Sequence, residues 1–323
     1  MDTSSPTPGA SEHDARVRTI SRSCPMCDST EAIASFEMTV RQFTRSNPGY
    51  HHELISNLGF DDDETFTIVR CVDCGFVYSQ HRLVDELAGY LYGKVIDHVH
   101  SKAKVLGSVK RRRLLKLWSE LFTLTTSDRD KISLRVLDFG CGWGEFLMVA
   151  QSPGVACLGF EIDQEKKSWA ESQGISITDD ERELDSAGPF DVIVANQVLE
   201  HVPCPLETVQ RFRNWLAPDG VIFLSVPNCA ESEIQKAIQE LKLGRLPVKE
   251  FNPWEHLNYF SPTSFRELVS KAGLEVIADD RGVGDGRIVR LLRRIGRPKS
   301  VQHSTAKSRG TSLYCRRSSK CDT

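Results

Sequence analysis

Apolar residues follow two alternating patterns between residues 133 and 280. Short strand-like runs alternate with stretches in which apolar residues recur at helical spacing. The strand-like runs are 134–137, 155–160, 175–177, 190–194, 221–226 and 274–277. The last run follows a helix predicted to begin after Ser261 and to end at Gly273. This alternation predicts a doubly wound α/β domain with a mostly parallel sheet covered by helices on both faces.

The chain ahead of this domain divides into three segments. Residues 1–20 are rich in Ser, Thr, Pro and Gly and are predicted to be disordered. Residues 21–95 hold short β-type runs beside two cysteine pairs, which is typical of a small, separately stabilised module. An amphipathic helix over about 101–124, within the connecting segment 96–131, leads to the α/β domain at 132–323.

Composition restricts the class of protein. The chain has 323 residues, of which 40% are hydrophobic, enough to bury a sizeable core. It shows neither an apolar run of the ~18 residues that a membrane span needs nor an N-terminal signal peptide, so a cytoplasmic protein without membrane contact is expected. The formal net charge is −3, and residues 281–323 form a basic C-terminal region.

The most informative motif follows the first strand of the α/β domain. Asp138–Gly144 reads DFGCGWG and is followed by a helical stretch. Glycines at such a turn let the backbone bend sharply and let a ligand approach closely. The spacing departs from the dinucleotide fingerprint G-x-G-x-x-G, because Glu145 stands where the third glycine would be. Glu161, after the second strand, is placed to accept both hydroxyls of a ribose, so an adenosine-bearing cofactor is expected.

Five motifs in this order resemble the class I S-adenosylmethionine-dependent methyltransferases. They are DFGCGWG at 138–144, GFEID at 159–163, FDVIV at 190–194, LEHV at 199–202 and LAPDG at 216–220. The resemblance covers about 132–280 and implies a seven-stranded, Rossmann-like sheet with S-adenosyl-L-methionine as cofactor. It also implies a seventh, antiparallel strand at 311–315, which leaves about 281–310 as a basic insertion.

The resemblance assigns roles around the glycine loop. Gly140, Gly142 and Gly144 approach the cofactor, Glu161 binds its ribose, and Asp138 lies beside its amino-acid portion. The chemistry agrees with this assignment. The cofactor carries a positive sulfonium and no pyrophosphate, so acids and bare backbone suit it better than an anion-binding cradle.

Further cofactor contacts are implied after the third and fourth strands. Asp180 is the candidate for the adenine amino group, and Asp179 could serve instead. Asn196 and Gln197 follow the fourth strand and would face the methionine end. A turn that merely needs glycine is the alternative explanation of the loop, and the accompanying motifs disfavour it.

Two C-x2-C pairs predict a metal site in the N-terminal module. Cys24 with Cys27 and Cys71 with Cys74 can each place two thiolates on one Zn²⁺, as in Cys₄ sites. The pairs lie farther apart than the ~15 to 20 residues typical of such sites, so the segment between them must loop out. Cys71–Tyr78 is similar to the zinc ribbon of a methyltransferase subgroup that includes enzymes acting on small metabolites. Four thiolates fill a tetrahedral shell, so the zinc is expected to be structural, with a redox pair as the alternative.

Candidate catalytic residues follow the fourth strand and precede the helix at 262–271. Methyl transfer needs proximity and, for a weakly acidic acceptor, a base. His201 and His256 are the candidates for this base, with Glu255 or Tyr259 as orienting partners. A capping or packing role explains His201 equally well, and a loop-closing hydrogen bond explains His256.

Three functions fit these observations. A methyltransferase acting on a sugar, polyketide, quinone-like or other small metabolite, mainly at oxygen, is favoured. An RNA methyltransferase that grips phosphates with the ribbon and the basic C-terminal region is the second. Charge disfavours nucleic acid as a partner, because residues 281–323 hold twelve Lys or Arg and two Asp, which leaves −13 on residues 1–280. A non-catalytic binding protein is the third, and the intact cofactor motif disfavours it.

Overall fold

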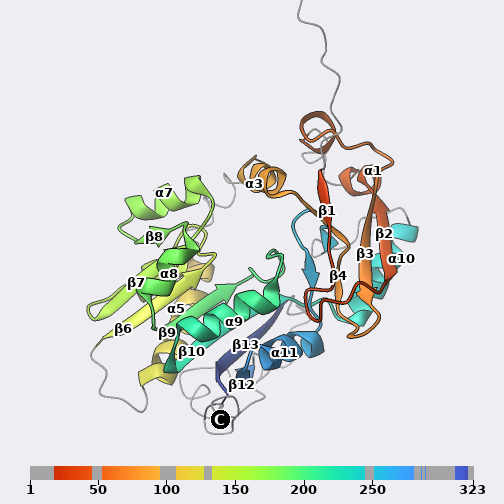
Figure 1. Ribbon diagram of the computed structural model, residues 1–323. Helices are drawn as coiled ribbons and strands as arrows, with labels where there is room; N and C mark the ends of the chain where they lie inside the picture. Colours follow the sequence, from red (N-terminus) through yellow and green to blue (C-terminus); the bar gives the residue numbers. More distant parts are fainter. Residues whose placement is uncertain are drawn as a thin grey trace, which may run out of the picture.

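The computed structural model describes two adjoining parts of the chain. Its described residues are 18–45, 53–94, 107–126, 133–243, 251–279, 285, 288 and 310–318. The N-terminal part, red to orange in Figure 1, lies beside an α/β domain coloured yellow to blue. Most of the expected insertion at 281–310 falls outside the described residues. The described part has no helix long and apolar enough to cross a membrane.

A seven-stranded sheet forms the centre of the α/β domain. Its strands are β6 (Leu134–Phe139), β7 (Val155–Phe160), β8 (Ile177–Thr178), β9 (Phe190–Asn196), β10 (Leu216–Pro227), β12 (Leu274–Asp279) and β13 (Gly310–Arg317). The strand order is β12-β13-β10-β9-β6-β7-β8. Pairing is parallel from β10 to β8, whereas β13 runs antiparallel to both β10 and β12. The sheet is therefore mixed, and the antiparallel seventh strand is confirmed.

Helices cover both faces of this sheet, because alternate residues of each buried strand point to opposite sides. The helices are α5 (Ser108–Thr126), α6 (Glu145–Ala150), α7 (Gln164–Ser172), α8 (Glu181–Ala187), α9 (Pro205–Trp215) and α11 (Pro262–Lys271). Val192 and Val194 pack with α5 and α6, whereas Ile193 packs in the layer that holds α9 and α11. This two-faced burial explains why the strands are continuous apolar runs.

Helix α5 begins later than the predicted helix at 101–124, and residues 95–106 lie outside the described part. Its Leu121 and Leu124 are buried against Val136 and Phe146 of the α/β domain. The predicted connecting segment therefore contributes a helix to the layer on one sheet face, because its apolar side matches that face.

The N-terminal part is built on a four-stranded antiparallel sheet. Its elements are β1 (Thr19–Ser21), β2 (Ala32–Thr39), α1 (Val40–Thr44), the π-helix η1 (Glu53–Asn57), β3 (Thr65–Cys71), β4 (Val77–Ser79), β5 (His81–Leu83) and α3 (Asp85–Lys94). The sheet order is β11-β4-β3-β2, and β11 (Asn258–Tyr259) comes from the α/β part of the sequence. Its core also includes Ile234 of α10 (Glu231–Lys242).

Residues 18–20, which the prediction of disorder included, are ordered in the structure. Strand β1 pairs with β5, so Thr19 lies opposite Leu83. Arg18 forms an ion pair with Glu64 at 3.1 Å, and its guanidinium lies 4.6 Å from the centre of the Phe60 ring. These contacts order the end of a segment whose composition predicted disorder.

Candidate functional site

Glycine is needed at three positions of the loop after β6 for different structural reasons. Gly140, Gly142 and Gly144 have φ values of 71°, 56° and 72°, a backbone conformation that L side chains rarely adopt. A Cβ at Gly140 would lie 2.6 Å from a Val198 methyl, and one at Gly144 would lie 3.2 Å from the Cβ of Ala170. A Cβ at Gly142 would meet no atom within 4 Å. The outer glycines thus permit close packing, whereas the middle one leaves open space for a ligand.

Glu161 follows β7 and is held against this loop. Its Oε2 accepts a hydrogen bond of 2.8 Å from the Gly142 N–H, and its Oε1 accepts one of 2.9 Å from the Asp163 N–H. The residue is only 8% exposed. Each oxygen retains capacity for another donor, because a carboxylate offers about four acceptor positions. The side chain is therefore fixed against the glycine loop.

A cavity of about 250 Å³ lies between the glycine loop and α5. Its lining residues are Lys110, Leu114, Leu117, Asp138, Gly140, Cys141, Gly142, Trp143, Glu145, Phe146, Lys166, Val194 and Asn196. Burial, with the nearby Glu161 and Glu145, raises the pKa of Asp138 to about 8. Glu145 pairs with Lys110 through Oε2, while its buried Oε1 has no partner among the described atoms. The cavity therefore brings the carboxyl groups of Asp138 and Glu145 together with Lys110 and Lys166, and a cationic ligand would favour the ionised form of Asp138.

Asn196 and Gln197 separate at the end of β9. Asn196 lines the cavity. Gln197 has φ 59°, its N–H donates to the Ser225 carbonyl at 2.8 Å, and its Nε2 donates to the Ser225 hydroxyl at 3.1 Å. Its side chain is thus bonded to β10, and only Asn196 of the predicted pair is a lining residue.

The two candidate adenine acids are already paired. Asp180 caps α8 and holds Arg182 at 2.6 Å, whereas Asp179 holds Lys167 at 2.6 Å and Gln164 at 2.8 Å. Neither acid lines the cavity. An adenine amino group would have to share either carboxylate with these partners.

The predicted catalytic residues His201 and His256 come together, with ring centres 4.8 Å apart. Nδ1 of His201 lies 2.8 Å from the Glu255 carbonyl oxygen. Because a carbonyl can only accept, Nδ1 carries the proton and Nε2 is the acceptor. Burial and the neighbouring His256 lower the pKa of His201 to about 3, so the ring is neutral near pH 7. Burial raises the pKa of the Glu255 carboxyl to about 7.

Glu200 is a member of this cluster that the sequence analysis did not assign. Its Oε1 lies 3.9 Å from Nε2 of His201, and its buried Oε2 has no partner among the described atoms. Burial raises its pKa to about 8. The signal for it was its place in the LEHV motif beside His201.

Tyr259 lies in the core of the N-terminal part instead of beside the histidines. It is 1% exposed, and its ring stacks on Phe251 with centres 5.5 Å apart. Its hydroxyl is 3.4 Å from the Ser79 hydroxyl, which donates to the His256 carbonyl. Among the described residues, Ser79 links Tyr259 to His256, because β11 directs the Tyr259 ring into that core.

Arg22 and Asn258 tie the two histidine-bearing loops together. The Arg22 guanidinium donates to the carbonyls of Pro203 and Leu257, each at 2.8 Å, and to Oδ1 of Asn258 at 2.9 Å. The Asn258 amide donates to the carbonyls of Leu199 and Val202 at 2.8 and 2.7 Å. The N-terminal part thus fixes the position of both loops.

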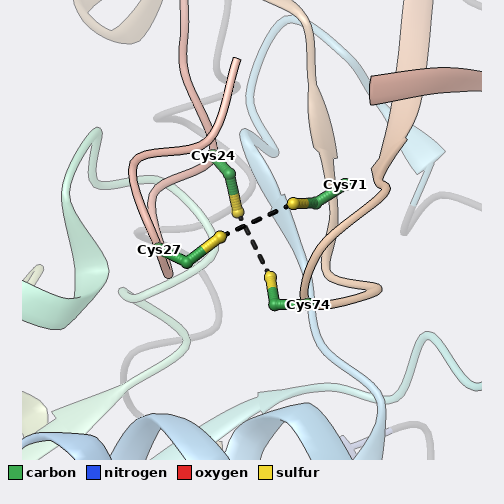
Figure 2. A group of neighbouring side chains, drawn as sticks. All are labelled: Cys24, Cys27, Cys71 and Cys74. Carbon is green, nitrogen blue, oxygen red and sulfur yellow. Dashed lines mark hydrogen bonds between the residues drawn. The ribbon is translucent and has the colours of Figure 1, made fainter. Parts of the chain in front are cut away.

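The four predicted metal ligands converge, as Figure 2 shows. The Sγ atoms of Cys24 and Cys74 are 3.5 Å apart, as are those of Cys27 and Cys71, and all four lie within 4.8 Å of one another. Zinc at ~2.3 Å from four tetrahedral sulfurs would set them about 3.8 Å apart. The four thiols therefore fit a Zn²⁺ ion closely.

The two cysteine turns have matching backbones. The residue after the second cysteine of each pair, Asp28 or Gly75, has positive φ, and its N–H donates to the carbonyl of the first cysteine, Cys24 or Cys71. Burial raises the pKa of the Cys24 thiol and raises that of Cys74 to about 11, whereas at Cys71 burial is outweighed by hydrogen bonds from the Cys74 N–H, the Cys27 thiol and the Asp73 N–H, which lower its pKa to about 7. Such turns aim N–H donors at sulfur, which favours the thiolate form that metals bind.

Comparison with known proteins decides the family. Residues 95–279 match a family model described as a methyltransferase domain. The chain belongs to this methyltransferase family. The mixed seven-stranded sheet agrees with the fold of the class I methyltransferases that the sequence motifs resemble. The match begins after the four metal-ligand candidates, so the cysteine site lies outside it.

Relatives of this methyltransferase include two ubiquinone biosynthesis O-methyltransferases. The protein from Actinobacillus pleuropneumoniae serotype 5b is 34% identical over 107 residues, 29% of this chain and 46% of that protein. The protein from Colwellia psychrerythraea is 32% identical over 159 residues, 45% of this chain and 62% of that protein. The chain thus spans about half the length of these relatives.

A solved structure supports the fold. The plantazolicin methyltransferase BpumL, in complex with a monoazolic desmethylPZN analog and SAH, matches with a TM-score of 0.50 and 16% identity. The match covers 72% of this chain and 94% of that one.

Proposed function

We propose that this methyltransferase transfers a methyl group from S-adenosyl-L-methionine to a small-molecule acceptor, preferentially at oxygen. The cavity beside Gly142 is the observation that carries this proposal, because it combines open space at the loop with the carboxyl groups of Asp138 and Glu145. The cofactor would supply the electrophilic methyl group. The relatives named O-methyltransferases of ubiquinone biosynthesis favour a small acceptor over RNA and over a non-catalytic role.

The chain's own residues divide the work of binding. Glu161 accepts the ribose hydroxyls from its fixed place against Gly142, and Gly142 lets the cofactor approach the backbone. Asp138 and Glu145 face the cationic portion, where a positive charge offsets their burial. Asn196, which lines the cavity, would contact the methionine end. Incubation with the cofactor and a panel of hydroxylated metabolites, followed by assay of released S-adenosylhomocysteine, tests the proposal. No binding of the cofactor by calorimetry would refute it.

Proton removal from the acceptor is assigned to the cluster of His201, His256 and Glu255. Nε2 of neutral His201 is an acceptor, but a pKa of about 3 makes this imidazole a weak base. Glu255, with a pKa of about 7, is better matched to neutral pH. Turnover should therefore rise with pH through about 7 as Glu255 ionises. This rise of turnover with pH should disappear in Glu255→Gln and persist, with a lower turnover, in His201→Ala. The reverse result would make the His201 imidazole the titrating group.

The four cysteines are proposed to hold a structural Zn²⁺, which would make the N-terminal part a zinc ribbon. Four sulfur ligands leave no open coordination position, so the ion takes no part in methyl transfer. Arg22, two residues before Cys24, contacts both histidine-bearing loops, so the ion would stabilise the active site indirectly. The described cysteines are free thiols, which suits a reducing compartment such as the cytoplasm.

A further inference from the structure

A second and larger cavity, the α5 groove, lies between α5 and the strands β10 and β13. Its volume is about 1030 Å³, at the upper end of the ~300 to 1,000 Å³ range of ligand pockets. Its lining residues are Gly107, Val109, Lys110, Arg113, Leu114, Lys116, Leu117, Glu120, Asn196, Phe223, Ser225, Ser312 and Tyr314. The groove therefore has room for a small molecule in addition to whatever occupies the cavity beside the glycine loop.

One wall of the α5 groove is basic. Lys110, Arg113 and Lys116 follow one another at intervals of three residues, which places them on successive turns of one helix side. Lys110 pairs with Glu145, but in the part of the chain that the structure describes, neither Arg113 nor Lys116 forms an ion pair with a carboxylate. The positive charge of this wall is therefore only partly compensated.

The opposite wall combines hydroxyl groups with an aromatic surface. The hydroxyls of Ser225 and Ser312 are 3.3 Å apart, and both residues line the groove. Phe223 and Tyr314 lie two residues along the same strands, so they face the same side of the sheet. The acid in the lining, Glu120, accepts a 2.5 Å hydrogen bond from the Tyr314 hydroxyl. Such a wall suits a ligand with an apolar body and polar substituents.

The α5 groove is continuous with the cofactor cavity. Lys110, Leu114, Leu117 and Asn196 line both. Asn196 also ends β9, at the sheet edge where the proposed function places the methionine end of the cofactor. A ligand in the groove would therefore lie directly beside the methyl donor.

We propose that the α5 groove binds one end of the methyl acceptor and that this end is anionic, a carboxylate or phosphate group on an apolar body. His201, His256 and Glu255 do not line the groove, so the reacting hydroxyl would lie at the other end of the acceptor, beyond Asn196. Arg113 and Lys116 would hold the anionic group, since Arg and Lys are the side chains that bind oxyanions through charge-assisted hydrogen bonds. The hydroxyl wall would face the remainder of the molecule. This inference rests on the proposed methyltransferase function for the role of the ligand as acceptor.

Matched pairs of probes test the charge requirement. Full-length protein saturated with S-adenosylhomocysteine is titrated calorimetrically with 3,4-dihydroxybenzoate against catechol, and with phenyl phosphate against phenol. The charged member of at least one pair should bind about tenfold more tightly, and the pair that does so distinguishes a carboxylate from a phosphate. Equal binding of the charged and neutral members in both pairs, or no binding of either anion, overturns the proposal.

Variants on one helix locate the effect. Arg113→Gln and Lys116→Gln should each weaken anion binding about five- to tenfold. Arg111→Gln and Arg112→Gln remove the same charge from exposed neighbours that do not line the groove, and should change it less than about twofold. An equal loss of anion affinity in all four variants would mean that the anion is attracted only by the overall positive charge of the helix, and would overturn the assignment.

The same titrations separate this proposal from the proposed function. Arg113 and Lys116 do not line the cofactor cavity, so their variants should bind S-adenosylhomocysteine like the unmodified protein. If the unmodified protein fails to bind S-adenosylhomocysteine, the methyltransferase function fails. The anion titration of the free protein still decides whether the α5 groove is an anion site.

Discussion

Binding of the cofactor should depend on the ionisation of Asp138. The residue is 4% exposed, and burial, with Glu161 and Glu145 nearby, raises the pKa of its carboxyl from 3.8 to about 8. In the free protein this group is therefore mostly protonated at pH 7. A cationic ligand in the cavity favours the carboxylate, so binding should release a proton from Asp138.

The size of the effect follows from the pKa. One pKa unit corresponds to about 1.4 kcal/mol, so ionising Asp138 costs about 1.4 kcal/mol at pH 7 and about 2.7 kcal/mol at pH 6. Affinity should rise up to about tenfold per pH unit from about pH 6 to 8 and level off above. The same raised pKa affects the stability of the free protein. The stabilisation from protonated Asp138 is fully present below the ordinary pKa of 3.8 and is lost as the pH rises through about 8, so the free energy of unfolding falls over this range.

Calorimetric titration with S-adenosylmethionine at about pH 6, 7 and 8 measures both quantities. Repetition in two buffers of different ionisation enthalpy gives the number of protons released, which should approach one per complex near pH 6. Asp138→Asn should bind weakly with little dependence on pH, and its thermal stability should fall less as the pH rises. A dissociation constant that stays unchanged from about pH 6 to 8 in the unmodified protein would refute the reasoning.

Three further results are expected. Elemental analysis should find about one zinc per chain, and the double change Cys24→Ser with Cys71→Ser should remove it. Full zinc content in that variant would mean that the ion lies elsewhere. Glu161→Ala should weaken cofactor binding by about 1 to 3 kcal/mol in calorimetry through loss of charge-assisted hydrogen bonds; unchanged affinity would mean another ribose partner. Gly142→Ala should weaken cofactor binding. Gly140→Ala should lower the melting temperature more than Gly142→Ala does, because only its new methyl group meets Val198.

The central sheet could largely be predicted from the sequence, because buried parallel strands are continuous apolar runs. The expected strand at 155–160 coincides with β7. The expected strand at 175–177 is instead Ile177–Thr178, because Ile175 fills the core from the turn after Gly174, which has φ 78°. An apolar residue at such a turn cannot be distinguished from a strand residue by hydrophobicity alone.

Some contacts of the candidate site are local in the sequence, and others join segments that are far apart. The glycine loop and Glu161 lie at the ends of adjacent strands, so their meeting follows from the βαβ pattern. The neighbours of Tyr259 depend on long-range contacts that leave no periodic signal, whereas Asp180 pairs with Arg182, only two residues along the chain. The α5 groove joins a helix to two strands far along the chain, so the sequence could supply its basic residues but not its opposite wall.

The pairing of β11 with β4 has a consequence for dissecting this protein. Asn258 lies opposite Tyr78, and Tyr259 opposite Val77, so the four-stranded sheet takes its edge strand from within the family-matched range. A fragment that begins at residue 95 would leave this strand without its neighbour and would remove Arg22 from the loops it holds. The boundary recognised in the sequence is therefore not a place where the folded protein can be divided. Exchange of the cysteine-bearing part between relatives would have to carry the partner segment 251–260 with it.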